Sequence, residues 1–142
     1  MFQHQISLSD NVPGCDHFKW HEVLFCPKWD VFIYPTASQY HSLIDVVQRL
    51  DRVRKSIGSP ITITSGLRPG LYNILIGGSK FSQHCLGKAL DFVVRGMTAD
   101  EVRSYLVDDL ELLCLRMEKL PGSNWVHIDT KEPGASGRFF NP

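Results

Sequence analysis

Two histidines and one aspartate have the types and the spacing to bind a metal ion. His84 lies at the end of a glycine-rich stretch, Asp91 follows within an apolar segment, and His127 lies in a second apolar segment near the end of the chain. Two imidazoles and one carboxylate form a three-ligand zinc set that leaves a fourth position for water, as in hydrolytic zinc sites. These residues could therefore form a catalytic metal centre.

Each of the three residues alone has a simpler explanation. A single histidine in a strand is commonly a hydrogen-bonded core residue, and Asp91 could pair with an arginine. However, Asp91 is flanked by Leu90 and Phe92 within the run 89–94, and burying a carboxylate there is costly unless it is paired or bound to a metal. The three residues together favour the metal site.

The segments around these residues resemble a known family. Residues 82–91 read Ser-x-His-x-x-Gly-x-Ala-x-Asp, residues 125–127 read Trp-x-His, and residues 65–68 read Ser-Gly-x-Arg. This combination resembles the M15 family of zinc D-Ala-D-Ala carboxypeptidases and related phage endolysins, and the resemblance covers about residues 36–130. It implies a zinc metallopeptidase, a hydrolase that cleaves amide bonds in the peptide stems of bacterial peptidoglycan during cell wall degradation.

The resemblance also implies roles for individual residues. His84, Asp91 and His127 would hold one Zn2+ per chain. Arg68 would act in catalysis and substrate binding, facing the substrate carboxylate or the developing oxyanion, unless it only forms a surface salt bridge. Ser82 would hydrogen-bond the substrate or hold the ligand loop, unless it only forms a turn.

The general base is not where several family members carry it. Those members have a glutamate or histidine a few residues before the last zinc ligand, whereas residues 121–125 here are Pro, Gly, Ser, Asn and Trp. Asp129 lies two residues after His127. If both belong to one strand, their side chains point to the same face of the sheet. We predict that Asp129 is the general base or orients the attacking water, with Glu118 and Glu132 as competing candidates. Alternatively, Asp129 hydrogen-bonds a ligand histidine and fixes its tautomer.

The missing base favours a second function of a different class. The protein would then be a zinc-bearing virion structural or cell-wall-binding protein that keeps the fold without turnover. A third hypothesis is a zinc-stabilised signalling or adaptor module, but no residue of the sequence favours it over the other two functions. A further group of possible metal ligands follows no established spacing, and comprises Cys15, His17, His21 and Cys26.

The elements that must position these residues follow from the periodicity of the sequence. Apolar residues recur at three- and four-residue steps through 38–57, which predicts an amphipathic helix from a Ser38 cap to Gly58. A Thr98–Glu101 capping box opens a second predicted helix through about Leu110. The predicted strands are 61–64, 89–94, 112–117 and 125–129.

These elements predict an α+β fold, a single domain with helices packed on a small, mainly antiparallel sheet that carries the zinc site. Residues 36–142 are the predicted M15-like peptidase domain. Residues 1–35 are irregular and aromatic-rich, and we predict an N-terminal wrap over the core with one helical turn around 17–24.

Composition and charge exclude several classes of partner. The chain of 142 residues has fifteen basic and fifteen acidic residues and no basic run, so we expect no nucleic-acid partner. We expect no membrane insertion, because no stretch reaches the roughly 18–20 apolar residues of a membrane span. The N-terminus lacks a secretory signal. We therefore expect synthesis in the cytoplasm, and action on the wall after release or from within a virion alongside other virion proteins.

Overall fold

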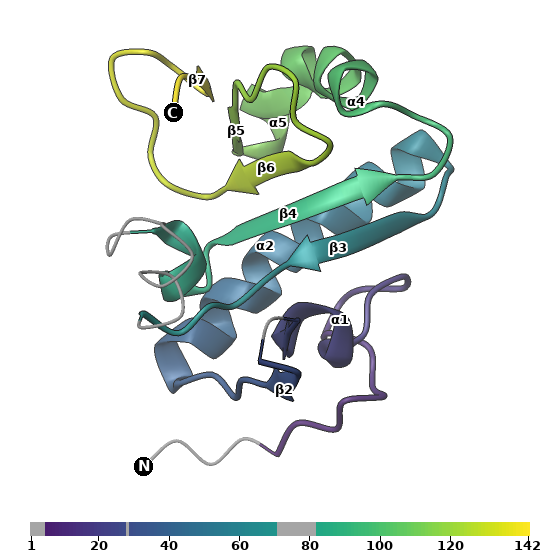
Figure 1. The fold of residues 1–142 in the computed structure, drawn as a ribbon, viewed down its shortest axis with the longest axis vertical. Coiled ribbons are helices and arrows are strands. Elements are labelled where there is room, and N and C mark those ends of the chain that lie inside the picture. Colours follow the sequence, from purple (N-terminus) through teal and green to yellow (C-terminus); the bar gives the residue numbers. More distant parts are fainter. Residues whose placement is uncertain (1–4, 28, 71–81) are drawn as a thin grey trace.

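A five-stranded sheet forms the centre of the fold (Figure 1). The computed structural model describes residues 5–27, 29–70 and 82–142. All neighbouring strands of the sheet are antiparallel except β5 and β7, which are parallel. The predicted α+β class with a mainly antiparallel sheet is thereby confirmed. The strands in spatial order are β3 (Ile61–Ser65), β4 (Ala89–Val94), β6 (Val126–Asp129), β5 (Arg116–Glu118) and β7 (Phe139–Phe140).

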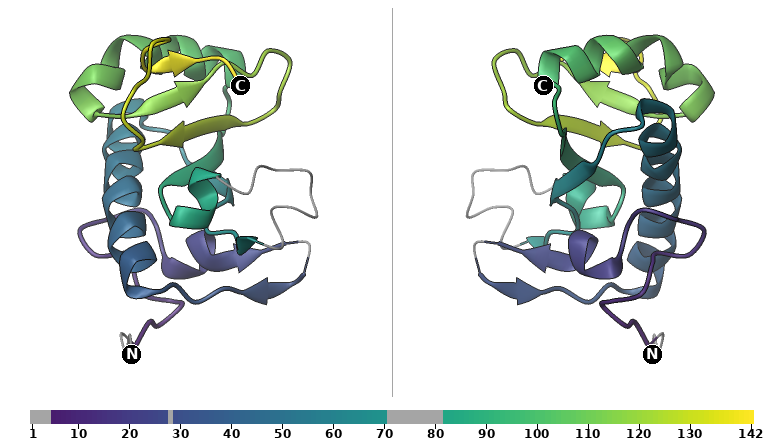
Figure 2. Two further views of the ribbon diagram at one scale, coloured as in Figure 1. Left: turned by 90° about the vertical axis from the view of Figure 1, so that its left-hand side faces the viewer. Right: turned by 90° about the vertical axis from the view of Figure 1, so that its right-hand side faces the viewer.

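Helix α2 (Ala37–Ile57) runs beside the sheet (Figure 2). Its apolar stripe is buried in the core, as the periodicity predicted. Gly58 ends the helix with a left-handed φ of 74°, which a residue with a Cβ rarely adopts. The predicted cap is corrected by two residues, because Thr36 rather than Ser38 accepts the hydrogen bond from the backbone N–H of Gln39. The buried apolar residues of the stripe are Leu43, Val46, Val47, Leu50 and Val53.

The second predicted helix forms as three consecutive segments. These are α4 (Ala99–Leu106), η2 (Val107–Asp109) and α5 (Leu110–Leu113), and Thr98 and Glu101 form the predicted capping box. The prediction of a strand over 112–117 was wrong at its start. Helical structure continues to Leu113, and Cys114 then takes a left-handed φ of 52° and lies exposed, so the strand begins only at Arg116.

The N-terminal residues form a small substructure beside the edge strand β3 (Figure 1). It consists of α1 (Trp20–Leu24) and a two-stranded sheet of β1 (Phe25–Cys26) and β2 (Val31–Phe32). The predicted helical turn near residues 17–24 corresponds to α1. Several side chains of residues 12–24 belong to the same hydrophobic core as α2 and the large sheet. These buried residues are Val12, Phe18, Trp20, Val23 and Leu24.

A buried carboxylate attaches this N-terminal segment to α2. Asp51 accepts hydrogen bonds from the backbone N–H groups of Asp16 and His17 at 3.2 and 3.1 Å. Its carboxylate also lies 3.2 Å from the Lys55 ammonium. Burial alone raises the pKa of Asp51, but the hydrogen bonds from Asp16, Lys55 and His17 outweigh it and hold the pKa below its usual value.

We expect Asp51→Asn to destabilise the protein by about 2 kcal/mol at neutral pH, because charge-assisted hydrogen bonds at a buried site are lost. The folded-state pKa of Asp51 is depressed, so its contribution is present above the unfolded pKa of about 4 and is lost as the pH falls below it. Urea unfolding at pH 7 and pH 3 measures the free energy of unfolding of both proteins. The difference between variant and wild type should be smaller at pH 3. Asp45→Asn, an exposed ion-pair partner on the same helix, is the matched control and should change stability by less than about 1 kcal/mol.

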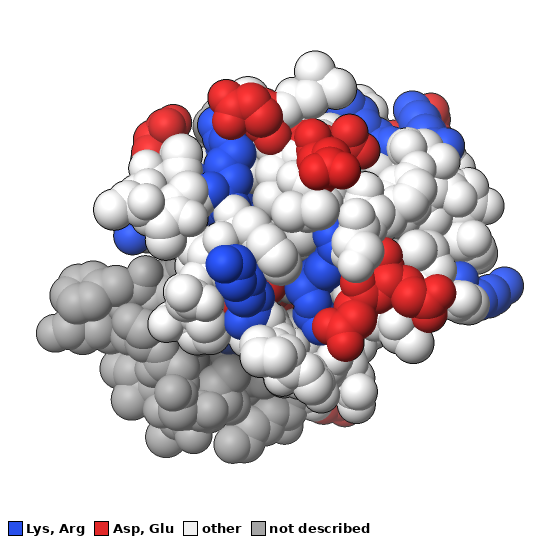
Figure 3. Space-filling view, turned by 90° about the horizontal axis from the view of Figure 1, so that it is seen from above, with Lys and Arg blue, Asp and Glu red and all other residues white. Residues whose placement is uncertain are grey.

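Charges of both signs are interspersed on the face of the molecule that Figure 3 shows. Figure 3 shows acidic and basic side chains side by side on one end of the molecule, in line with the balanced net charge. None of the described helices has the length and apolar character that crossing a membrane requires.

Candidate metal centre

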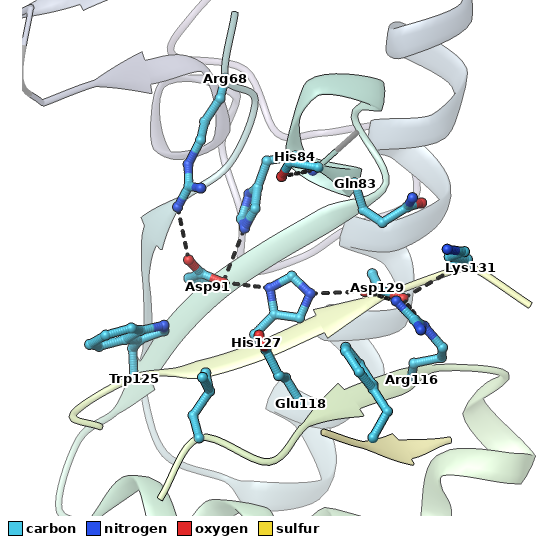
Figure 4. A pocket seen from close by; sticks show the side chains of 13 residues that line it. Arg68, Gln83, His84, Asp91, Arg116, Glu118, Trp125, His127, Asp129 and Lys131 are labelled. Carbon is cyan, nitrogen blue, oxygen red and sulfur yellow. Dashed lines mark hydrogen bonds and ion pairs between the residues drawn. The ribbon is translucent and has the colours of Figure 1, made fainter. Parts of the chain in front are cut away.

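The three predicted metal ligands come together from three separate elements (Figure 4). His84 lies in the short 3-10 helix η1 (Gln83–Leu86), which leads into β4. Asp91 lies within β4, directly opposite His127 of the neighbouring strand β6. One potential ligand atom from each residue lies within 4.8 Å of the other two. We call these three residues the His-Asp-His cluster.

Hydrogen bonds fix which ring nitrogen of each histidine faces the cluster. Nδ1 of His84 lies 2.9 Å from the carbonyl oxygen of Gly66, which can only accept, so Nδ1 carries the proton. Nε2 of His127 lies 2.8 Å from a carboxylate oxygen of Asp129 and donates to it. The remaining nitrogens, Nε2 of His84 and Nδ1 of His127, face Asp91, and they would bind a metal ion that displaces the protons between them and the carboxylate.

Both of these nitrogens face the same oxygen of Asp91. Oδ1 lies 3.1 Å from Nε2 of His84 and 2.9 Å from Nδ1 of His127. Burial alone raises the pKa of Asp91, but the hydrogen bonds from the two imidazoles hold it well below its usual value. Burial alone lowers the pKa of His127, yet hydrogen bonds to Asp129 and Asp91 raise it to about 9.

The electrostatics of the cluster favour a cation between its three members. In the protein alone, an imidazolium proton supplies that positive charge, because both neighbouring groups of His127 are carboxylates. Two imidazole nitrogens and one carboxylate oxygen are a donor set that zinc prefers, and each histidine is held by an acceptor on its other nitrogen, as zinc ligands commonly are. The residues present therefore fit a zinc ion.

Two glycines of the motifs allow the backbone approaches that build the cluster. A Cβ on Gly66 would lie 2.2 Å from the backbone oxygen of Val23 in α1, so no other residue fits there without displacing the loop. Gly87 ends η1 with a φ of +73°, and a Cβ there would lie 2.9 Å from the backbone oxygen of Gln39 in α2. The loops that carry His84 and its acceptor thus pack directly on α1 and α2.

Arg68 and Ser82 both line the cleft beside the cluster. The guanidinium of Arg68 donates from Nε to the hydroxyl of Ser65 at 2.8 Å and from Nη2 to Oδ2 of Asp91 at 3.1 Å. Its side chain is only 18% exposed, so the salt bridge is not a surface one. Ser82 caps η1, and its hydroxyl accepts from the backbone N–H of His84 at 3.2 Å. This contact fits the role of holding the ligand loop, and a hydrogen bond from Ser82 to the substrate stays a prediction.

Asp129 has the contacts of a positioning residue. Its side chain is fully buried, and Arg116 donates to its two oxygens at 2.7 and 2.9 Å. The backbone N–H of Lys131 and the His127 ring occupy the same oxygens. Asp129 also lies on the side of the His127 ring that faces away from Asp91 (Figure 4). These contacts favour the alternative, in which Asp129 orients the ligand histidine, and the role of general base stays a prediction.

We expect Asp129→Asn to weaken zinc binding by about 10–100-fold, as loss of a group that orients a zinc ligand typically does. Turnover at saturating zinc should fall much less than zinc affinity. Zinc titration of the metal-free protein, followed by activity at saturating metal, measures both. The reverse result, normal zinc affinity with most turnover lost, would restore Asp129 as general base.

The cluster lies in an open cleft of about 400 Å³. Sequence reasoning did not place Arg116, Lys131 and Phe140 in this cleft. Arg116 could have been found only with the pairing of β5 and β6, which sets it opposite Asp129; its guanidinium also lies 3.8 Å from the centre of the Phe140 ring. The residues that line the cleft are Arg68, Ser82, Gln83, His84, Asp91, Arg116, Glu118, Leu120, Trp125, His127, Asp129, Lys131 and Phe140.

The second group of possible ligands does not assemble. Within the described residues, the His-Asp-His cluster is the one set of three or more ligand side chains that converges. Cys15 and Cys26 are buried free thiols, and burial raises the pKa of Cys15 to about 12, which keeps it protonated. His17 instead contacts Asp51.

Two imidazoles and a carboxylate that converge in an open cleft have the arrangement of a hydrolytic zinc site, and comparison with known proteins places the chain among peptidases. The family model described as Peptidase M15 matches residues 16–129. The chain therefore belongs to the Peptidase M15 family, and the match begins well before residue 36, where the resemblance of the motifs begins.

No curated protein matched the chain significantly. Among solved structures, the L-Ala D-Glu endopeptidase ChiX of Serratia marcescens is similar at 18% identity, over 70% of this chain and 90% of that chain, with a TM-score of 0.47.

Proposed function

We propose that this protein is a zinc-dependent peptidase that hydrolyses amide bonds in the peptide stems of bacterial peptidoglycan. The observation that carries the proposal is the His-Asp-His cluster itself. Its three ligand atoms converge in an open cleft, and hydrogen bonds to Gly66 and Asp129 direct the other nitrogen of each histidine toward Asp91. Membership of the Peptidase M15 family supports the same conclusion.

The protein's own residues hold and align the reacting groups. His84, Asp91 and His127 hold the ion, and Asp129 keeps the His127 ring in the correct tautomer. When bound, zinc polarises the amide carbonyl and lowers the pKa of water. The guanidinium of Arg68 is fixed by Ser65 and Asp91, so its charge is oriented toward the cleft before the substrate arrives, as stabilisation of an oxyanion requires.

The cleft suits a substrate that carries carboxylates. Arg68 and Lys131 both line it, and peptide stems bear free carboxylates that cationic side chains can pair with. We propose further that the protein is a D-Ala-D-Ala carboxypeptidase or an endolysin-like endopeptidase of phage origin. It would act on the cell wall after release or from within a virion.

A second function remains a candidate for one specific reason. Residues 121–125, where several family members carry the base, have no acid or imidazole, and Asp129 is buried and fully engaged. A zinc-bearing virion structural or cell-wall-binding protein with this fold would need neither a base nor turnover. Such a protein would bind peptidoglycan without cutting it.

Digestion of purified peptidoglycan separates the two functions. We expect the protein to release fragments cut within the peptide stems, with a chelator suppressing release and added zinc restoring it. Mass analysis of the fragments identifies the bond that is cut and distinguishes an endopeptidase from a carboxypeptidase. Zinc-loaded protein that sediments with peptidoglycan yet releases no fragment would support the binding function instead.

A further inference from the structure

We propose that Glu118 is the catalytic carboxylate that carries the proton during amide hydrolysis. In this role it takes a proton from the attacking water and delivers it to the leaving nitrogen. The inference rests on the proposed function and names the residue that performs its proton transfer, which the motif positions before His127 do not supply.

Strand pairing brings Glu118 to the metal-binding face of the sheet. β5 and β6 are antiparallel, with Arg116 opposite Asp129 and Met117 opposite Ile128. The same register continued by one residue places Glu118 beside His127. Alternate residues of a strand point to the same face. Glu118 therefore shares the face of Arg116, whose guanidinium contacts Asp129 there.

The side chain of Glu118 extends into the cleft. Figure 4 shows it running from β5 toward the His127 ring, and it lines the cleft together with Arg68 and Trp125. It is half-buried, in contrast to the fully buried Asp129. A water molecule or a substrate amide in the cleft can therefore reach its carboxylate.

Of the three carboxylates that line the cleft, Glu118 is the one left for proton transfer. Asp91 is engaged by both imidazoles and by Arg68. Asp129 is engaged by Arg116, His127 and a backbone N–H. Within the described part of the chain, the carboxylate of Glu118 makes no hydrogen bond or ion pair. The earlier competitor Glu132 is exposed and does not line the cleft.

The reaction balances with water as the only co-reactant. The water oxygen bonds to the carbonyl carbon as one of its protons passes to the Glu118 carboxylate. The carbon–nitrogen bond then breaks, and Glu118 returns that proton to the leaving nitrogen, which departs as an amine. The other water proton remains on the new carboxylic acid and ionises to solvent, so Glu118 ends as the carboxylate that it was at the start.

The test uses full-length protein and a peptide stem that wild type cleaves. We expect Glu118→Gln to lower kcat by about 100–10,000-fold with KM within about threefold of wild type. Zinc content and the rise in Tm on adding zinc to metal-free protein should match wild type, because Glu118 is not a ligand. Glu132→Gln, an exposed carboxylate outside the cleft, is the matched control. Glu118→Asp keeps the carboxylate and should exceed Glu118→Gln in kcat by at least about tenfold.

Several outcomes would overturn this role. Near-normal turnover of Glu118→Gln, or equal turnover of the Asp and Gln variants, removes Glu118 from proton transfer and leaves the proposed function intact. Loss of zinc or of the zinc-induced rise in Tm would make it a metal-site residue, and a raised KM with normal kcat would make it a substrate-binding one. Zinc-loaded wild type that cleaves no stem bond overturns the proposed function, and the role of Glu118 with it.

Discussion

Alanine at His84, Asp91 or His127 should abolish both zinc binding and hydrolysis. Wild type should carry about one zinc ion per chain, whereas two ligands cannot hold the ion at comparable affinity. Metal analysis and the Tm in the presence and absence of zinc are the measurements. Zinc at about 100 times its Kd stabilises the folded wild type by about 2.7 kcal/mol, and the variants should gain much less.

His21→Ala is the matched control for the ligand variants. His21 is an exposed histidine outside the cleft, so zinc content and activity should be unchanged. Among the ligands, Asp91→Ala should have the largest effect on folding, because Asp91 contacts both histidines and Arg68. Wild type that carries no zinc, and whose Tm does not respond to added zinc, would refute the metal centre.

Arg68→Ala should lower kcat by about 100–1000-fold, the usual cost of removing a donor to an oxyanion. The guanidinium lies beside the cluster, and contacts to Ser65 and Asp91 fix its orientation. Arg68→Lys keeps the charge but not the planar arrangement of donors, so it should recover only part of the activity. Steady-state kinetics with a stem peptide, together with the Tm of each variant, measures the effect.

Arg138→Ala controls for the loss of an ion pair as such. Arg138 pairs with Glu111 and is 19% exposed, close to the 18% of Arg68, but it does not line the cleft. It should leave turnover per folded molecule unchanged. Normal turnover in folded Arg68→Ala, accompanied by a large drop in Tm, would make Arg68 a structural residue.

The local elements of the fold could largely be predicted from the sequence. The strand 89–94 has the predicted bounds, and α2 ends before Gly58 as predicted, because apolar periodicity and a glycine stop are local signals. The error at 112–115 has a local cause as well. The run Leu112–Leu115 is apolar but not periodic over enough residues to distinguish a strand from the last turn of a helix.

The site depends on pairing between strands, which periodicity does not reveal. The convergence of Asp91 and His127 needs β4 and β6 to pair in one register, and only the family resemblance indicated that they do. The ion pair of Arg116 with Asp129 needs a second register, that of β5 and β6. Asp129 was therefore predicted on the correct strand face but without the partners that engage its carboxylate.

The contact between Gly66 and α1 bears on how short a functional version of this protein can be. The N–H of Leu67 donates to the carbonyl of Val23 at 3.0 Å, next to the Gly66 carbonyl that holds the His84 ring. A chain shortened to begin at residue 36 would keep every residue of the cleft. It would nevertheless lose the surface of α1 on which the loop bearing Gly66 and Arg68 packs. Both the carbonyl that accepts from His84 and the guanidinium of Arg68 would then lose their fixed positions. Shortening or fusion of this enzyme should therefore spare the residues from Val12 onward.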